Sequence, residues 1–133
     1  AEKIPAPNNT FDRVFFFAGF HHIQDPDKSL SECYRVLKNG GELYLILEPS
    51  CPKIFQKLFD RHTKRDEIQE KSYTRSEYRK LLQKDFSLME FHNFTGYFNR
   101  ESRRSLIYYL FLSVLPDFVI NLFPCSQVII AKK

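Results

Sequence analysis

Glycine is scarce in this chain, with only four among its 133 residues, and tryptophan is absent. No glycine-rich phosphate or nucleotide loop precedes the first long apolar run, and the chain contains no P-loop motif. The three cysteines, Cys33, Cys51 and Cys125, are far apart and lack the spacing of metal ligands. We therefore expect reduced thiols in a cytoplasmic protein rather than a zinc site or a disulfide-stapled scaffold.

The signatures of several other functions are also missing. There is no Ser-His-Asp arrangement around a nucleophile elbow and no aromatic RNA-binding signature. The formal net charge is only +4, and the basic excess in the middle of the chain is typical of a solvated helical face. Nucleic acid is therefore not an expected partner, and no signal peptide is recognised.

What the sequence does contain is a strand–helix–strand pattern between Phe11 and Ser50. Val14–Phe20 is a nearly unbroken apolar run, which predicts a strand buried on both faces. Asp25 is a suitable N-cap for the helix, and Asn39-Gly40-Gly41 is predicted to end it with a left-handed glycine. Leu43–Leu47 is the second buried strand. Strands joined in this way are expected to be parallel, with a ligand-binding edge at their carboxyl ends.

Two histidines and one glutamate are placed at this edge by the pattern. Adjacent residues of a strand point to opposite sides, so His21 and His22 are poor joint ligands for one metal ion. One of them is expected to line the edge while the other caps or packs. Glu48 ends the second strand, where it either binds a substrate polar group or acts as a general base, or simply caps the turn before Pro49. His21 and Glu48 are the candidate substrate-binding residues.

The remaining segments give weaker signals. We predict helices over Lys53–Asp60 and Thr74–Lys84, and strands over Phe86–Phe94 and Gln127–Ala131. Leu106–Phe123 is apolar and nearly long enough to cross a membrane, yet Pro116, Asp117 and Asn121 interrupt it. A helix–break–helix packed over a pocket or against a partner is favoured over a membrane span. Monotopic contact with a bilayer surface stays open.

Several short motifs occur in an order that is typical of one family. The first is a loop-like segment, Ala1-Glu2-Lys3-Ile4-Pro5, and the second is Phe11-Asp12. These are followed by Phe20-His21-His22-Ile23 and then by Arg35-Val36-Leu37-Lys38-Asn39-Gly40-Gly41. With these motifs the chain resembles a class I S-adenosylmethionine-dependent methyltransferase. The resemblance is strong over residues 1–50 and looser over Tyr73–Gly96.

The resemblance implies an α/β fold, the C-terminal part of a Rossmann-like methyltransferase sheet with parallel strands, a final antiparallel strand and helices on the faces. The chain is interpreted as a single partial methyltransferase domain over residues 1–133. Its parts would be a strand–helix–strand core (1–50), helices and a strand (51–96), an apolar insertion (97–124) and the final strand (125–133). The family's glycine-rich cofactor loop has no counterpart in this sequence.

The resemblance also implies S-adenosylmethionine as the cofactor. By analogy, Ala1 and Glu2 would flank the adenine, Ala18, Gly19 and Phe20 would approach the methionine part through backbone groups, and His22 would lie close by. No residue is assigned a catalytic role. The sulfonium is already a good leaving group, so alignment of the acceptor supplies much of the rate.

Two functions are compatible with this pattern. The first is S-adenosylmethionine-dependent methyl transfer to a small-molecule or lipid-like acceptor, with weak or no activity expected of these 133 residues alone. The alternative is a non-catalytic truncated methyltransferase fold that acts as a partner-binding subunit. In either case, Leu106–Phe123 is the candidate surface for a peripheral membrane contact or for a homo-oligomer.

Overall fold

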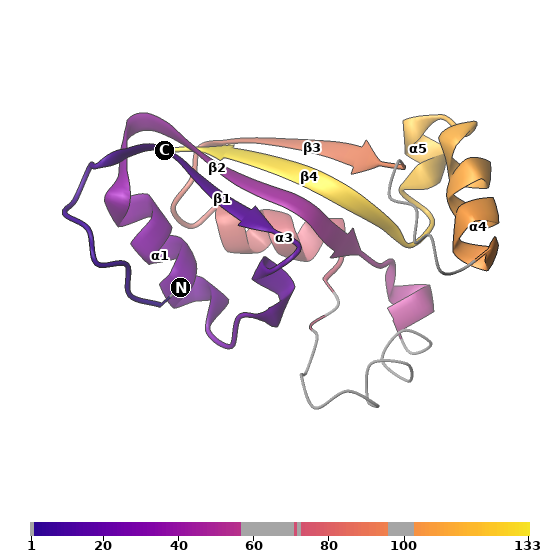
Figure 1. The fold of residues 1–133 in the computed structure, drawn as a ribbon, viewed down its shortest axis with the longest axis horizontal. Helices are drawn as coiled ribbons and strands as arrows, with labels where there is room; N and C mark the ends of the chain where they lie inside the picture. Colours follow the sequence, from indigo (N-terminus) through magenta and orange to yellow (C-terminus); the bar gives the residue numbers. More distant parts are fainter. Residues whose placement is uncertain (1, 57–70, 72, 96–102) are drawn as a thin grey trace.

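The computed structural model describes residues 2–56, 71, 73–95 and 103–133, and these include one four-stranded sheet (Figure 1). The strands are β1 (Phe11–Phe17), β2 (Leu37–Ser50), β3 (Leu88–Phe94) and β4 (Cys125–Lys132). The helices are α1 (Pro26–Val36), α3 (Arg75–Leu82), α4 (Arg103–Ser113) and α5 (Asp117–Ile120), together with a short 3₁₀ turn, η1 (Phe20–His22). Residues 53–56 are helical, and the rest of the helix predicted over Lys53–Asp60 lies outside the described residues.

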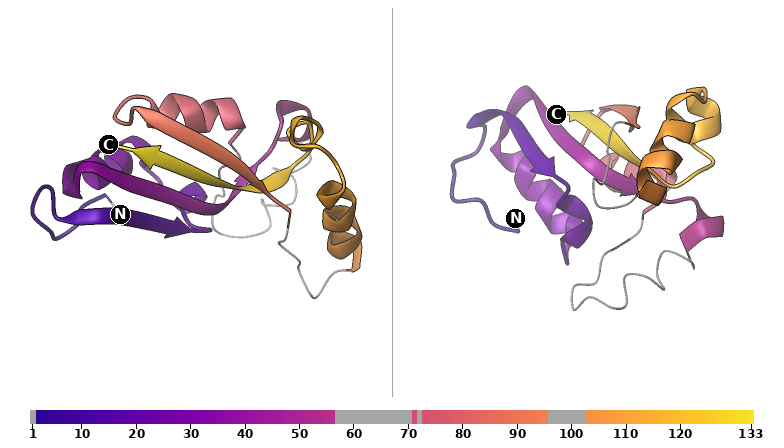
Figure 2. Two further views of the ribbon diagram at one scale, coloured as in Figure 1. Left: turned by 90° about the horizontal axis from the view of Figure 1, so that it is seen from above. Right: turned by 45° about the vertical axis from the view of Figure 1, so that its right-hand side comes forward.

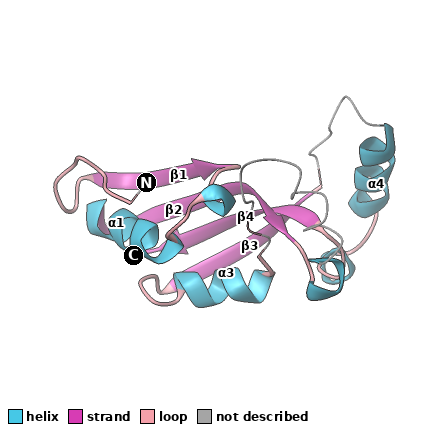
Figure 3. Ribbon diagram, turned by 90° about the horizontal axis from the view of Figure 1, so that it is seen from below, coloured by secondary structure: helices cyan, strands magenta, loops and turns pink. Residues whose placement is uncertain are grey.

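The strand order across the sheet is β1-β2-β4-β3. β1 and β2 are parallel, as predicted, and β4 runs antiparallel to both of its neighbours, β2 and β3. The structure thus confirms the predicted α/β fold class with its final antiparallel strand. Figure 3 shows α1 and α3 beside each other on one face of the sheet, where the two helices are in contact.

α1 and α3 close the main hydrophobic core against that face. Both helices begin at predicted caps: Asp25 accepts a hydrogen bond from the Lys28 N–H at 3.0 Å, and Thr74 and Glu77 form a reciprocal capping box. The core is formed by side chains from the helices, the turn and the strands: Phe20, Leu30, Cys33, Leu37, Leu43, Leu45, Tyr78, Leu82, Phe86, Ile129 and Ala131. This packing fixes the strand ends that carry the candidate site.

The predicted glycine cap of α1 is wrong. The helix already ends at Val36, and its C-cap residue, Leu37, has extended backbone. Gly40 does adopt a left-handed φ of 78°, but within β2, where the pairing with β1 shifts register. A side chain at Gly41 would place its Cβ 3.1 Å from the Asp12 carbonyl oxygen. The two glycines therefore serve a bulge and a close backbone approach rather than a helix end.

The prediction that the first strand is buried on both faces is also wrong. Phe15 is 58% exposed and Phe17 is 70% exposed, whereas Val14 and Phe16 pack against the core. The physical reason is position, because β1 is an edge strand and α1 and α3 both cover the other face. Phe15 stacks on Tyr44 of β2, with ring centroids 5.0 Å apart, and leaves its outer face open.

The apolar segment near the C-terminus forms a helix–break–helix, as predicted. α4 ends at Ser113 and α5 begins after Pro116, which is the N-cap of α5. The two helices lie at the end of the sheet where β4 begins (Figure 2). They pack there through a small second core of Leu112, Ile120 and Cys125, with Tyr108, Tyr109, Leu115 and Phe123 around it. Within the described parts of the chain, every helix is too short or too polar to cross a membrane.

Candidate active site

A local irregularity in β2 determines where Glu48 points. Leu43 and Leu45 face the core, and simple alternation would bury Leu47 next. Instead Leu47 has a φ of 57°, and the pairing with β4 shifts register between Leu45 and Glu48. A bulge of this kind re-aims the residues that follow it. The side chain of Glu48 is turned into the core, where it is completely buried.

The buried carboxylate of Glu48 holds the turn that follows β1. Its Oε1 accepts hydrogen bonds from the backbone N–H groups of Gly19 (2.9 Å) and Phe20 (2.8 Å). Its Oε2 accepts from the His21 N–H at 3.1 Å, from His21 Nδ1 at 2.9 Å and from the Tyr78 hydroxyl at 3.4 Å. One side chain at the end of β2 therefore sets the shape of η1 at the end of β1.

These contacts also decide the charge of Glu48. Burial raises the pKa of its carboxyl, but the hydrogen bonds from His21 and from the backbone N–H groups of Phe20 and Gly19 lower it by more. The net pKa lies below the ordinary value of 4.5, so the group is ionised at neutral pH. The same carboxylate helps to raise the pKa of Tyr78 well above its ordinary value, after burial as the first cause.

The two histidines are arranged differently from the prediction. They lie on the 3₁₀ turn η1 rather than on a strand, so they do not point to opposite sides. Their ring centroids are 4.0 Å apart, and both residues line the same cavity. Because an ionised carboxylate can only accept, the ring proton of His21 is on Nδ1, facing Glu48. In the neutral tautomer that this contact selects, the other ring nitrogen, Nε2, is an acceptor.

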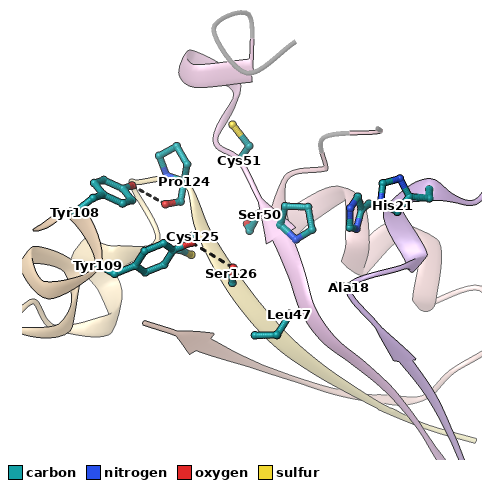
Figure 4. Close-up of a pocket in the computed structure, with 12 residues that line it drawn as sticks. Ala18, His21, Leu47, Ser50, Cys51, Tyr108, Tyr109, Pro124, Cys125 and Ser126 are labelled. Atoms are coloured by element: carbon teal, nitrogen blue, oxygen red, sulfur yellow. Dashed lines mark hydrogen bonds between the residues drawn. The ribbon is translucent and has the colours of Figure 1, made fainter. Parts of the chain in front are cut away.

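The cavity has a volume of about 440 Å³ and lies between η1, the end of β2 and α4 (Figure 4). Ala18, His21 and His22 form one wall, and Leu47, Pro49, Ser50 and Cys51 lie along the strand end between the walls. Tyr108, Tyr109, Pro124, Cys125 and Ser126 form the opposite wall. The lining thus joins the predicted ligand edge with the apolar segment near the C-terminus.

Two non-glycine residues of this lining have left-handed backbone. Ala18, with a φ of 46°, directly follows β1, and Leu47, with a φ of 57°, is in the neighbouring strand. Such conformations cost about 1–3 kcal/mol each and persist where the surroundings enforce them. Here the Ala18 N–H donates to the Ile46 carbonyl at 2.8 Å, which ties the two irregular positions together. Strained backbone of this kind clusters at binding sites.

The α4 wall is apolar with few polar groups. The Tyr108 hydroxyl donates to the Pro124 carbonyl at 2.6 Å, and the Tyr109 hydroxyl lies 3.4 Å from the Ser126 hydroxyl. Burial raises the pKa of Tyr108 to about 12 and that of the Cys125 thiol to about 11. At neutral pH the Cys125 side chain is a neutral thiol, which makes it a poor nucleophile. This wall offers a surface for an apolar or aromatic ligand.

The structure brings together only some of the residues expected at the site. Ala18, His21 and His22 line the cavity, while Glu48 lies behind η1. Gly19 and Phe20 use their backbone N–H groups on Glu48, so those groups are not free to donate to a ligand. The Glu2 carboxylate forms an ion pair with Lys28 of α1, with Oε2 and Nζ 3.8 Å apart, and Glu2 is not among the residues that line the cavity. Ala1 lies outside the described residues.

Sequence reasoning missed three features of the site. The pairing of His21 with Glu48 joins residues 27 positions apart, and nothing in the spacing signals it. Tyr78 approaches the same carboxylate from α3, and it was not among the residues predicted for the site. Tyr108 and Tyr109 belong to the apolar run over Leu106–Phe123. Their two adjacent hydroxyl groups were the one signal that could have indicated that this part of the run lines a cavity.

Comparisons with known proteins agree with this geometry. Residues 1–45 match a family described as a methyltransferase domain. The resemblance to class I S-adenosylmethionine-dependent methyltransferases is confirmed. The matched residues contain β1, η1, α1 and β2 as far as Leu45, so the match ends before Glu48.

One curated relative is the ubiquinone/menaquinone biosynthesis C-methyltransferase UbiE from Escherichia coli, which is 50% identical over 54 residues. The match covers 41% of this chain and 21% of the relative, so the chain spans about a fifth of that methyltransferase. α4 and α5 lie outside residues 1–45, the range that matches the methyltransferase family.

Solved structures extend the likeness to nearly the whole chain. An S-adenosylmethionine-dependent methyltransferase from Archaeoglobus fulgidus has a TM-score of 0.61 at 17% identity, over 96% of this chain and 61% of that chain. A complex that contains the Haloferax volcanii Trm112 methyltransferase activator gives 0.66 at 14% identity, over 98% and 57%. At these identities the likeness shows the fold, and activity has to be argued from the site.

Proposed function

We propose that this chain contributes to S-adenosylmethionine-dependent methyl transfer to a small, apolar acceptor. The observation that carries the proposal is the shared cavity. The family-matched turn with Ala18, His21 and His22 faces Tyr108 and Tyr109 of α4 across about 440 Å³. A cofactor on the first wall and an acceptor on the second would meet at the carboxyl ends of β1 and β2, where open α/β sheets bind ligands.

The residues present fit the methionine end of the cofactor in part. Ala18 and His22 line the cavity and would hold this end, whereas Glu48 occupies the backbone N–H groups of Gly19 and Phe20. When bound, the cofactor supplies an activated methyl group on a sulfonium. The role of Gly19 and Phe20 is then to shape the turn rather than to bind directly. Glu2 and Ala1 remain proposed neighbours of the adenine.

The acceptor that suits the second wall is a flat, apolar ring. Tyr108 and Tyr109 present aromatic faces, and the neutral Cys125 thiol adds a polarisable apolar surface. The relative from Escherichia coli is named for methylation at carbon in ubiquinone and menaquinone biosynthesis. We therefore propose an aromatic or quinone-like ring as the acceptor.

We propose His21 as the general base of this reaction. Methylation of a carbon or hydroxyl acceptor releases one proton, and a general base within reach accelerates its loss. Glu48 fixes the proton of His21 on Nδ1, so Nε2 can accept from the acceptor and Glu48 stabilises the resulting positive charge. In this proposal His21 contacts the substrate, and Glu48 is a positioning residue that acts through it.

The test is methyl transfer from labelled S-adenosylmethionine by the whole protein that carries this chain, with a set of quinol and phenol acceptors. The His21→Asn variant should lose about 10²–10⁴-fold in kcat, the range of general-base catalysis, with cofactor affinity retained. His92→Asn is the matched control, because His92 forms an exposed pair with Glu90 at 3.3 Å on β3, and it should leave the rate unchanged. Full activity of His21→Asn would refute the role of His21. No transfer to any ring acceptor would refute the proposed acceptor class.

A second candidate function is partner binding without catalysis. The supporting observation is β1, an edge strand whose outward residues Phe15 and Phe17 are more than half exposed. Calorimetry with S-adenosylhomocysteine separates the two functions. Binding to the whole protein that is weakened by Ala18→Trp would favour the enzyme. No binding, together with a stable complex with another chain, would favour the partner-binding subunit.

A further inference from the structure

An apolar stripe runs along the outside of α4 and α5. On α4 it includes Leu106 and Leu110, which are 41% and 51% exposed, and Val114, just past the end of the helix, is 78% exposed. It continues on α5 and the turn after it with Phe118 and Leu122, which are 73% and 64% exposed. Exposed apolar side chains gathered on two neighbouring helices mark an interaction site more often than a scatter of single residues does.

The stripe leads into a shallow groove that adjoins the candidate active site. The groove has a volume of about 380 Å³ and is lined by Arg104, Ile107, Tyr108 and Phe111. Tyr108 also lines the cavity, so the groove and the cavity share one lining residue. An occupant of the groove would therefore lie beside the cavity.

Charge favours one kind of occupant. α4 begins with Arg103 and Arg104, both exposed, and its eleven residues include no carboxylate. The one acidic residue of α5, Asp117, already accepts a hydrogen bond from Asn93 at 3.0 Å. A second copy of this surface would offer no other carboxylate on α4 or α5 to the two arginines. An anionic lipid surface offers both phosphate groups for the arginines and acyl chains for the stripe.

We propose that α4 and α5 lie in the surface of an anionic bilayer. The apolar stripe would enter the boundary between headgroups and acyl chains, and Arg103 and Arg104 would contact lipid phosphates. The contact is interfacial, in keeping with the absence of a membrane-crossing helix in the described residues. The proposal does not depend on the methyl transfer proposed above, and binding can be measured without any acceptor or cofactor.

Vesicle flotation with the full chain tests the proposal. Vesicles of phosphatidylcholine mixed with phosphatidylglycerol should carry the protein, and vesicles of phosphatidylcholine alone should carry less. The double variant Val114→Ser, Phe118→Ser should weaken binding about tenfold or more, because two inserted apolar side chains are lost. Leu88→Ser is the matched control, since Leu88 is 65% exposed on β3, and its binding should equal that of the wild type.

The arginines have a separate expected signature. Arg103→Gln and Arg104→Gln should each weaken binding roughly fivefold to anionic vesicles, and added salt should reduce the difference. Circular dichroism checks that every variant is folded. Equal flotation of the serine double variant and the Leu88→Ser control would overturn the proposal. So would a dimer, seen by size exclusion with light scattering, that these substitutions dissociate while the wild type fails to float.

Discussion

The two walls of the cavity are built on opposite physical principles. The η1 wall is fixed by polar contacts, because one fully buried carboxylate, Glu48, accepts from three backbone N–H groups and from His21. The α4 wall is held by a small apolar core around Leu112, and its outer surface remains exposed. The first wall lies in the segment that matches the methyltransferase family, apart from Glu48 itself, and the second lies outside it.

This difference suggests a division of labour. Reacting groups need fixed positions, and a buried hydrogen-bond network provides them at the cost of being intolerant to loss of any member. An acceptor surface needs shape and apolarity, and a small helical segment can supply them while remaining easier to open. The experiments below compare the two walls by how much stability a single substitution removes and by how far along the chain its effect on hydrogen exchange extends.

The largest effect is expected from Glu48→Ala. The substitution leaves three backbone N–H groups and His21 without their acceptor, and loss of one member of a buried charged network typically costs about 3–5 kcal/mol. The free energy of unfolding, measured in urea, should fall by that amount. Glu90→Ala is the control, because Glu90 is exposed beside His92 on β3, and it should change stability by less than about 0.5 kcal/mol. Equal effects of both substitutions would contradict the network.

A pair of core substitutions should show that the walls open independently. Leu45→Ala and Leu112→Ala both remove a fully buried leucine, and such changes cost about 2–5 kcal/mol. Leu45 belongs to the main core, so its loss should raise hydrogen exchange throughout the sheet. Leu112→Ala should raise exchange in residues 103–123 alone. Exchange that spreads equally from both sites would show that the two cores form a single cooperative unit.

Acid should weaken the η1 wall through Glu48. Its folded pKa is lowered, so the stability it contributes is fully present above the ordinary value of 4.5 and is lost as the pH falls through the folded pKa. The stability difference between the wild type and Glu48→Gln should therefore shrink below about pH 4.5, by at most about 1.4 kcal/mol per pH unit. Urea titrations at several pH values measure this difference. A stability difference between the wild type and Glu48→Gln that widens towards low pH would contradict a lowered pKa of Glu48.

The smallest effect is expected on the α4 wall from Tyr108→Phe. The variant loses one hydrogen bond to the Pro124 carbonyl, which is worth about 1 kcal/mol. Thermal unfolding should register a small drop in Tm. A Tm equal to or above that of the wild type would contradict this hydrogen bond.

Much of the fold could be predicted from local chemistry. Asp25 and the Thr74–Glu77 capping box predict the starts of α1 and α3. The apolar runs around Phe16 and Leu45 predict the parallel strands β1 and β2. The helix–break–helix over residues 106–123 follows from Pro116. One prediction failed because a residue had two possible uses. Gly40 has the left-handed backbone of a helix cap, yet it serves a bulge, and only the pairing of β2 with β1 reveals this.

The site was predictable only in outline. The carboxyl ends of the strands placed His21, His22 and Glu48 at one edge, but the direction of each side chain depended on irregular backbone. The positive φ of Leu47 turns Glu48 into the core, and the turn η1 puts both histidines on one cavity. Alternation along ideal strands predicts the opposite in both cases. Strain at a bulge arises from tertiary packing, so a single sequence does not signal it.

The central claim is that η1 and α4 form one site, with cofactor on one wall and acceptor on the other. The most direct measurement is an experimental structure of the whole protein with S-adenosylhomocysteine. We predict that its sulfur lies in the cavity beside Ala18 and His22, facing Tyr108 and Tyr109, with Glu48 still bound to the turn. A ligand bound elsewhere, or a cavity closed by α4 with no room for the sulfur, would contradict the claim.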